Sequence, residues 1–247
     1  MMMALGAAGT ATAQSGTAAT VLTPSTVSSG SALSIAITGI SGFSGLPSSV
    51  ALTLQPGFTS SIKSVSALCT STQSGSNGCP AASQIGTGAV GVSFFGSPTT
   101  VPLKLYLGDP IQPGDIASVI LSGSLDGINL TVSGRLFVPP GGGLELLLSS
   151  FPSEPVTLDA LSVSMYASRT VTKTIITRVT KTVFTGKGKH RHKHKVHKKV
   201  KKKIKTVYSA ITNPSTCTST GAWTGTAIFT YSSGTDQLPL TAICTAS

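Results

Sequence analysis

The uneven distribution of charge constrains the fold of this chain more than any other feature. Fifteen of its eighteen Lys and Arg residues and all four His lie between Arg169 and Lys205, a stretch that contains no Asp or Glu. Elsewhere the chain has three basic and seven acidic residues, so the formal net charge of +11 divides into +15 on this basic segment and −4 on the remainder. A stretch so densely charged cannot enter an apolar core. The sequence therefore predicts a nearly uncharged folded domain with a cationic insertion at residues 169–205.

The remainder of the chain has the pattern of an all-β domain. Only 10% of the 247 residues are charged, against roughly 25% in average soluble domains. Short apolar-alternating runs separated by Gly, Pro, Asn and Asp indicate strands, whereas no run outside the basic segment has helical periodicity. The predicted strands are residues 31–40, 50–54, 89–95, 101–107, 117–125, 128–138, 144–148, 156–166, 221–231 and 238–244. We expect a β-sandwich or Greek-key-like domain built from residues 14–168 and 206–247, with a type I′ hairpin turn at Asp126-Gly127.

The basic segment itself has two halves. Val171 to Phe184 is rich in Thr and β-branched residues, which favour a strand. From Lys187 to Lys205, fifteen of nineteen residues are Lys, Arg or His. Val196, Val200 and Ile204 are spaced by four, which suits one face of a strand or of a helix equally. We expect a projecting basic hairpin; a short helix in the second half or a partly disordered segment are the alternatives.

Several features indicate an oxidising, extracellular compartment. The apolar residues 1–13 end in Ala11-Thr12-Ala13, which fits a partial signal peptide. No later run of about eighteen apolar residues predicts a transmembrane segment. Four cysteines permit three pairings, of which Cys69 with Cys79 and Cys217 with Cys244 would each close a short loop between predicted strands. A structural zinc site is disfavoured because there is no Cys-x-x-Cys pair. We expect a secreted protein, or one associated with the cell wall, with two disulfides.

Four sequence runs resemble a β-domain of secreted and cell-surface proteins of actinobacteria. They are Cys69, Cys79-Pro80-Ala81-Ala82-Ser83-Gln84-Ile85-Gly86-Thr87, Leu105-Tyr106-Leu107-Gly108-Asp109-Pro110 and Asn213-Pro214-Ser215-Thr216-Cys217. The resemblance covers roughly Ser61 to Tyr166 and Thr206 to Cys244, and the Cys-Pro-Ala-Ala-Ser-Gln-Ile-Gly run is its most specific part. It implies an extracellular β-module with local disulfides and no known activity. The family usually has a short connection where this chain carries the basic segment, so the resemblance does not explain that segment.

The charge of the basic segment predicts binding to a polyanion. Suitable partners are teichoic-type wall polymers, sulfated glycans, anionic lipid and nucleic acid. Sequence-specific reading of nucleic acid is disfavoured, because no aromatic residues interleave with the charges to stack on bases. The predicted polyanion-binding residues are Lys187, Lys189, Arg191, Lys193, Lys195, Lys198, Lys199, Lys201, Lys202, Lys203 and Lys205. Oligomeric state is left open by the sequence.

Two other functions, a structural surface module and a glycan hydrolase, are alternatives to polyanion binding. The segment could be a solvated linker of a structural surface module. A glycan hydrolase would need paired carboxylates, for which Glu145, Glu154 and Asp159 are the nearest cluster. A Ser-His-Asp site is disfavoured since every His lies in the basic segment. We therefore expect a protein that is not an enzyme.

No metal or cofactor is expected either. Asp109 and Asp115 flank a Pro-rich loop, but they lack the alternating oxygen ligands of a calcium loop. His190, His192 and His194 have a spacing that could bring imidazoles to one metal ion. The neighbouring Lys and Arg charges oppose a divalent cation there.

Overall fold

A computed structural model describes residues 16–40, 45–75, 78–94, 97–125, 128–149, 151, 156–185 and 192–246. The chain divides into two compact units. One, here called the body, comprises the chain up to Arg169 together with Ser209–Ser247. The other, here called the arm, is Thr170–Tyr208. The predicted signal peptide, residues 1–13, lies outside the described residues.

Strands make up nearly all regular structure of the body, as predicted. Its strands are β1 (Thr17–Thr23), β2 (Gly30–Thr38), β3 (Ser49–Leu54), β4 (Gln84–Phe94), β5 (Ser97–Gly108), β6 (Asp115–Leu125), β7 (Ile128–Phe137), β8 (Leu144–Ser149), β9 (Val156–Met165), β12 (Ile211–Thr212), β13 (Ala222–Tyr231) and β14 (Gly234–Ile243). The helical pieces in the described chain are α1 (Ser71–Gly75) and the 3-10 turns η1 (Ile62–Ser64) and η2 (Ala81–Ser83). The all-β fold class is therefore confirmed. The sequence analysis missed β1 and β12 and began β4, β5 and β14 several residues too late.

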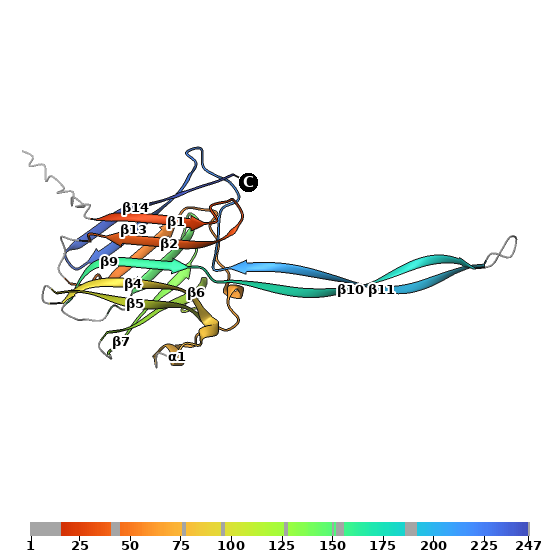
Figure 1. The fold of residues 1–247 in the computed structure, drawn as a ribbon, viewed down its shortest axis with the longest axis horizontal. Helices are drawn as coiled ribbons and strands as arrows, with labels where there is room; N and C mark the ends of the chain where they lie inside the picture. Colours follow the sequence, from red (N-terminus) through yellow and green to blue (C-terminus); the bar gives the residue numbers. More distant parts are fainter. Residues whose placement is uncertain are drawn as a thin grey trace, which may run out of the picture. The chain divides into compact units, whose positions relative to one another are not determined.

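The described body strands form one twelve-stranded sheet in the order β1-β2-β9-β4-β5-β6-β7-β8-β3-β13-β14, with β12 pairing β2. Every strand pairing in this order is antiparallel. The two ends of the order meet beyond β1 and β14, where Thr245 N–H donates to Ser25 O at 2.8 Å and Val27 N–H donates to Thr245 O at 3.3 Å. The sheet thus nearly closes on itself (Figure 1).

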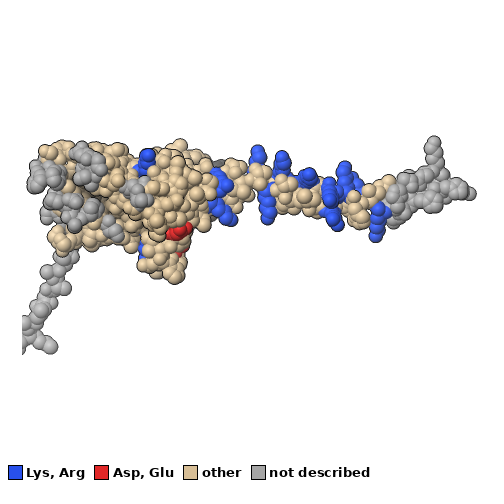
Figure 2. All heavy atoms as spheres, turned by 90° about the horizontal axis from the view of Figure 1, so that it is seen from below, with Lys and Arg blue, Asp and Glu red and all other residues tan. Residues whose placement is uncertain are grey.

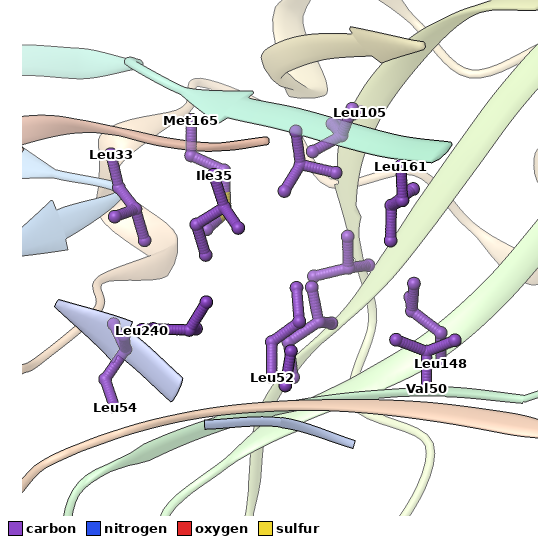
Figure 3. Packing of buried hydrophobic residues seen from close by; sticks show 14 of the residues in the cluster. Leu33, Ile35, Val50, Leu52, Leu54, Leu105, Leu148, Leu161, Met165 and Leu240 are labelled. Carbon is purple, nitrogen blue, oxygen red and sulfur yellow. The ribbon is translucent and has the colours of Figure 1, made fainter. Parts of the chain in front are cut away.

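Alternating side chains place the core inside this nearly closed sheet. In β3 the even-numbered residues Val50, Leu52 and Leu54 are buried, and in β8 Leu144, Leu146 and Leu148 are buried. Figure 3 shows side chains of β3 and β8 facing those of β2 and β9 across the core. This period-two burial is what the apolar alternation in the sequence predicted.

Prolines within the strands occupy positions where no ladder hydrogen bond is required. Pro239 lies in β14, at the end of the strand order. Pro98 and Pro102 lie in β5, which pairs with β6 only from Leu103 onward. Proline cannot donate to a sheet ladder, so each lies where its strand has a single partner.

Both expected disulfides are present and connect neighbouring segments of the body. The Cα atoms of Cys69 and Cys79 are 5.1 Å apart, and those of Cys217 and Cys244 are 5.7 Å apart. The first closes the loop that contains α1, and Cys69 packs with Tyr106 and Ile120. The turn residues Asp126 and Gly127 lie outside the described residues, but Leu125 and Ile128 are partners on either side of them. Among the described residues, no helix is long and apolar enough to cross a bilayer.

Candidate polyanion-binding arm

The arm is built from two long strands, β10 (Ser168–Thr185) and β11 (His192–Ser209), which form a sheet of their own. They run antiparallel (Figure 1). β-Branched Thr, Val and Ile, which favour extended backbone, fill most of β10. The preferred prediction of a hairpin is therefore confirmed for the described residues. The alternative of a helix in the second half is wrong, since paired strands satisfy the backbone while spreading like charges along an extended chain.

Two hydrogen bonds define how β10 and β11 face each other. Ala210 N–H donates to Ala167 O at 2.8 Å, and the Thr180 hydroxyl lies 3.0 Å from Nδ1 of His197. The number of residues from Ala167 to Thr180 equals the number from His197 to Ala210. A single antiparallel register without a bulge therefore fits both contacts. In this register Thr180 lies opposite His197, and residues of the same face alternate along each strand.

One face of the arm, here called the Thr/Lys face, carries the denser charge. Its described members are Thr170, Thr172, Thr174, Ile176, Arg178, Thr180 and Thr182 on β10 and Lys195, His197, Lys199, Lys201, Lys203, Lys205 and Val207 on β11. Successive side chains on one face of a strand are about 6.6 Å apart. From Lys199 to Lys205, each lysine is thus closer to the next one on this face than the Debye length of about 8 Å in physiological salt. Their fields add, and a polyanion would experience them together.

The opposite face, here called the stripe face, combines cations with apolar residues. Its cations in the described part are Lys173, Lys181, Lys198 and Lys202. Its exposed apolar residues, here called the stripe, are Ile175, Val179, Val183, Val196, Val200 and Ile204. In the register above, each stripe residue has another stripe residue diagonally across, within reach of large side chains.

Side-chain exposure supports this division of the faces. The six stripe residues are 37% to 44% exposed, whereas Ile176 and Val207 on the Thr/Lys face are 56% and 63% exposed. Neighbouring apolar side chains shield one another along the stripe, and Ile176 and Val207 lack such neighbours. The sequence analysis noted the spacing of Val196, Val200 and Ile204 but missed its counterpart on β10, where Ile175, Val179 and Val183 repeat the same interval.

The predicted polyanion-binding residues fall into three groups. Lys195, Lys198, Lys199, Lys201, Lys202, Lys203 and Lys205 lie on β11 and are exposed. Lys193 belongs to β11 by its backbone, but its side chain is outside the described part of the structure. Lys187, Lys189 and Arg191 lie outside the described residues. Figure 2 shows Lys and Arg side chains along the described length of the arm.

Three further cations of β10, absent from the predicted set, belong to the same surface. Lys173, Arg178 and Lys181 are exposed, and the register places them beside the lysines of β11. Arg178 lies opposite Lys199 on the Thr/Lys face. The arm contains no Asp or Glu, so none of these cations has an acidic partner within its own unit. The signal was available in the sequence as regularly spaced basic residues in a β-branched run.

The two candidate hydrolytic carboxylates that the structure describes, Glu145 and Asp159, do not form a pair. Glu145 lies on β8, where its carboxylate accepts a bond from the Thr53 hydroxyl at 3.4 Å. Asp159 lies on β9 and accepts from the Ser93 hydroxyl at 2.5 Å. Four strands separate β8 from β9 along the sheet order. Glu154 is outside the described residues.

Glu145 also borders an open hollow of about 420 Å³ in the body. The hollow is lined by Thr53, Gln55, Pro139, Pro140 and Thr226, among other residues, and Glu145 is the one ionisable side chain among the described residues of its lining. A general acid and a general base are both needed for glycoside hydrolysis. Among the described residues, the lining of this hollow supplies one carboxylate, Glu145, and no second carboxylate to act with it as acid or base.

Asp109 and Asp115, the two carboxylates that flank the Pro-rich loop, have different surroundings. Asp115 forms an ion pair with Arg135, with the Arg135 Nη2 atom 2.7 Å from Oδ1 and Nε 3.0 Å from both carboxylate oxygens. Its Oδ2 also accepts from the Gln112 N–H at 2.8 Å. These hydrogen bonds, the one from Arg135 foremost, lower the pKa of Asp115 against the opposing effect of burial. Asp109 is exposed, and no group of three or more potential metal ligands occurs among the described residues.

The histidines with His-x-His spacing fall largely outside the described part of the structure. His190 lies outside it, and the side chains of His192 and His194 are likewise not described. The fourth histidine, His197, is hydrogen-bonded to Thr180 as described above.

A buried Asp and Tyr lie near one end of the β13–β14 pair. Asp236 has no exposed surface and Tyr231 is 5% exposed. Burial, and to a smaller extent the Asp236 charge, raises the pKa of Tyr231 to about 12. The phenol therefore stays protonated at neutral pH and is no base there. Sequence reasoning assigned neither residue a role.

Comparisons with protein-family models, curated proteins and solved structures give no match to this chain. The resemblance of the run from Cys79 to Gly86 to an actinobacterial β-domain stays a prediction.

Proposed function

We propose that this protein is a secreted or cell-surface β-module that binds anionic polymers through the arm and catalyses no reaction. The observation that carries the proposal is the exposure of the arm's cations. The structure describes ten Lys and Arg side chains in the arm, and all ten are exposed. The sequence of this unit contains no acidic residue. Such an array lowers the free energy of an encounter with any dense anion and accelerates it.

The body supports the extracellular part of the proposal. Its two disulfides are typical of proteins that fold in oxidising compartments. The apolar residues 1–13 fit the end of a signal peptide. A wall polymer, a sulfated glycan, an anionic lipid surface and nucleic acid bound without sequence reading are all partners whose charge matches the arm.

Salt-dependent retention on heparin tests the proposed function. In the test variant Lys195, Lys199, Lys201, Lys203 and Lys205 are changed to Thr, which removes five charges from the Thr/Lys face and keeps a residue that favours strands. We expect the intact protein to elute at clearly higher salt than this variant, with an affinity that falls log-linearly with salt concentration, because each contact releases counterions.

A matched control changes the same five residues to Arg, which keeps their charge. We expect this control to elute like the intact protein or later, since guanidinium also pairs bidentately with sulfate-like groups. Equal elution of the intact protein and the Lys→Thr variant would refute the proposal and favour a solvated linker.

A further inference from the structure

The stripe face exposes a row of apolar side chains, and binding of a hydrated anionic polymer does not require them. The six apolar side chains of the stripe run in a continuous zigzag across both strands of the arm, each 37% to 44% exposed. Isolated exposed apolar residues are ordinary, but a contiguous exposed apolar surface indicates a partner. Sulfated glycans, teichoic-type polymers and nucleic acid backbones present charge and water, and they have no apolar surface to cover a row of Val and Ile.

The cations of the stripe face restrict the partner further. In the register, Ile204 lies opposite Lys173, Ile175 opposite Lys202, Val179 opposite Lys198 and Val196 opposite Lys181. Four of the six stripe residues thus lie opposite a lysine, and Val200, opposite Thr177, lies between Lys198 and Lys202 on its own strand. Packing against the stripe of a second copy would bring these lysines against one another without any counter-charge in either arm, which is unfavourable. The partner must therefore be apolar beneath the stripe and anionic at its margins.

We propose that the arm lies flat on an anionic lipid surface, with the stripe at the level of the upper acyl chains and the flanking lysines at the lipid phosphates. This inference rests on the proposed function and identifies its partner as a lipid surface. Lysine reaches from an apolar contact to a polar headgroup through its flexible stem. Each Lys or Arg near an anionic membrane strengthens the binding, and burial of the stripe adds to this attraction.

The geometry of the arm favours lying in the interface over crossing the bilayer. Each strand has 18 residues, about 60 Å at the usual rise, which is twice the hydrocarbon thickness of about 30 Å. A two-stranded sheet has an unpaired edge on each strand, and such edges are costly in hydrocarbon but stay hydrated at the headgroups. The Thr/Lys face would then point to water.

The test compares two matched double variants of the full-length protein. Val179→Thr with Val200→Thr removes apolar groups from the middle of the stripe, and Ile176→Thr with Val207→Thr removes them from the Thr/Lys face. All four substitutions keep a β-branched residue and the net charge. Binding is measured by co-sedimentation with vesicles of phosphatidylcholine alone and of phosphatidylcholine mixed with phosphatidylglycerol, and salt elution from heparin is measured in parallel.

We expect the intact protein to bind the mixed vesicles and not the neutral ones. The stripe variant should bind the mixed vesicles roughly tenfold more weakly, the scale expected for two buried methyl groups replaced by hydroxyls. The Thr/Lys-face variant should bind like the intact protein, and all three should elute from heparin at the same salt concentration. Equal vesicle binding by the two variants would overturn the lipid proposal while leaving polyanion capture intact.

A second measurement reports the position of each face directly. Val200→Trp and Ile176→Trp place a fluorophore on opposite faces of the arm. We expect acyl-chain-brominated lipid to quench the added fluorescence of the first variant and not that of the second. Quenching of both or of neither would overturn the proposed orientation, as would stripe-dependent dimerisation in sedimentation equilibrium without lipid. Failure of the intact protein to be retained on heparin is a separate outcome, which would refute the proposed function itself.

Discussion

At the scale of single residues, the Asp115–Arg135 pair makes the stability of the body depend on pH. Hydrogen bonds from Arg135 and from the Gln112 backbone lower the pKa of Asp115 in the folded protein. A carboxyl whose folded pKa lies below its unfolded value of about 3.9 contributes stability above that pH and loses it as pH falls through the folded pKa. We expect Asp115→Asn to be less stable than the intact protein at pH 7, with a difference that shrinks as the pH falls below about 4. Urea unfolding at a series of pH values measures this.

Asp109→Asn is the matched control, because Asp109 lies near the same loop but is exposed. Its stability should follow that of the intact protein across the pH series. A stability difference for Asp115→Asn that stayed constant from pH 7 to pH 2 would show that the ion pair is not the cause.

At the scale of elements, the two disulfides constrain loops of different length. Cys217 and Cys244 are separated by 27 residues and Cys69 and Cys79 by 10. If each bridge acts on the unfolded chain, their loss should cost roughly 3.5 and 2.7 kcal/mol respectively. Cys244 also belongs to the main core cluster, together with Trp223, whose ring meets that of Phe58 edge-on with 5.6 Å between the ring centroids. We therefore expect the double Cys→Ser change at 217 and 244 to be the more destabilising one.

Denaturant unfolding of the two double variants under identical non-reducing conditions checks this order. The Cys69→Ser, Cys79→Ser protein serves as the internal reference, since its bridge packs with the small Tyr106–Ile120 cluster. A larger loss of unfolding free energy in that variant than in the Cys217→Ser, Cys244→Ser variant would contradict the loop-length argument.

At the scale of the whole molecule, the body should fold without the arm. Ala167 and Ala210 are already joined by a backbone hydrogen bond of 2.8 Å at the base of the arm. Replacing residues 170–207 by Asn-Gly, between Arg169 and Tyr208, supplies a two-residue hairpin turn at that point. We expect the free energy of unfolding to stay the same or to rise by at most roughly 2 kcal/mol, because loop-closure entropy varies slowly with length. Urea unfolding and far-UV circular dichroism measure the outcome.

The same shortened protein should lose retention on heparin, since it lacks all the described cations of the arm. A shortened protein that does not fold would show that the arm is part of the folding unit. A folded one that still binds heparin would place the binding surface on the body.

The sequence alone determined most of the strands and the distribution of charge. Alternation in runs such as Leu33–Thr38 has a period that only a strand can satisfy with one buried face, so the all-β fold was predictable. Segregation of fifteen cations into one stretch made a solvent-exposed arm unavoidable. The local disulfides were preferred for their short loops, although their pairing was one choice of three.

Only the tertiary structure decided which strands are neighbours and which side chains share a face. β3 lies between β8 and β13, a non-local order that the local apolar pattern does not encode. Glu145 and Asp159 are close in sequence but lie on strands that the sheet separates. The stripe became visible only through the register of β10 against β11, because a shift of one residue would turn Ile175 and Val179 to the opposite face. Pairing is set by long-range contacts, whereas strand formation and charge are local properties of the chain.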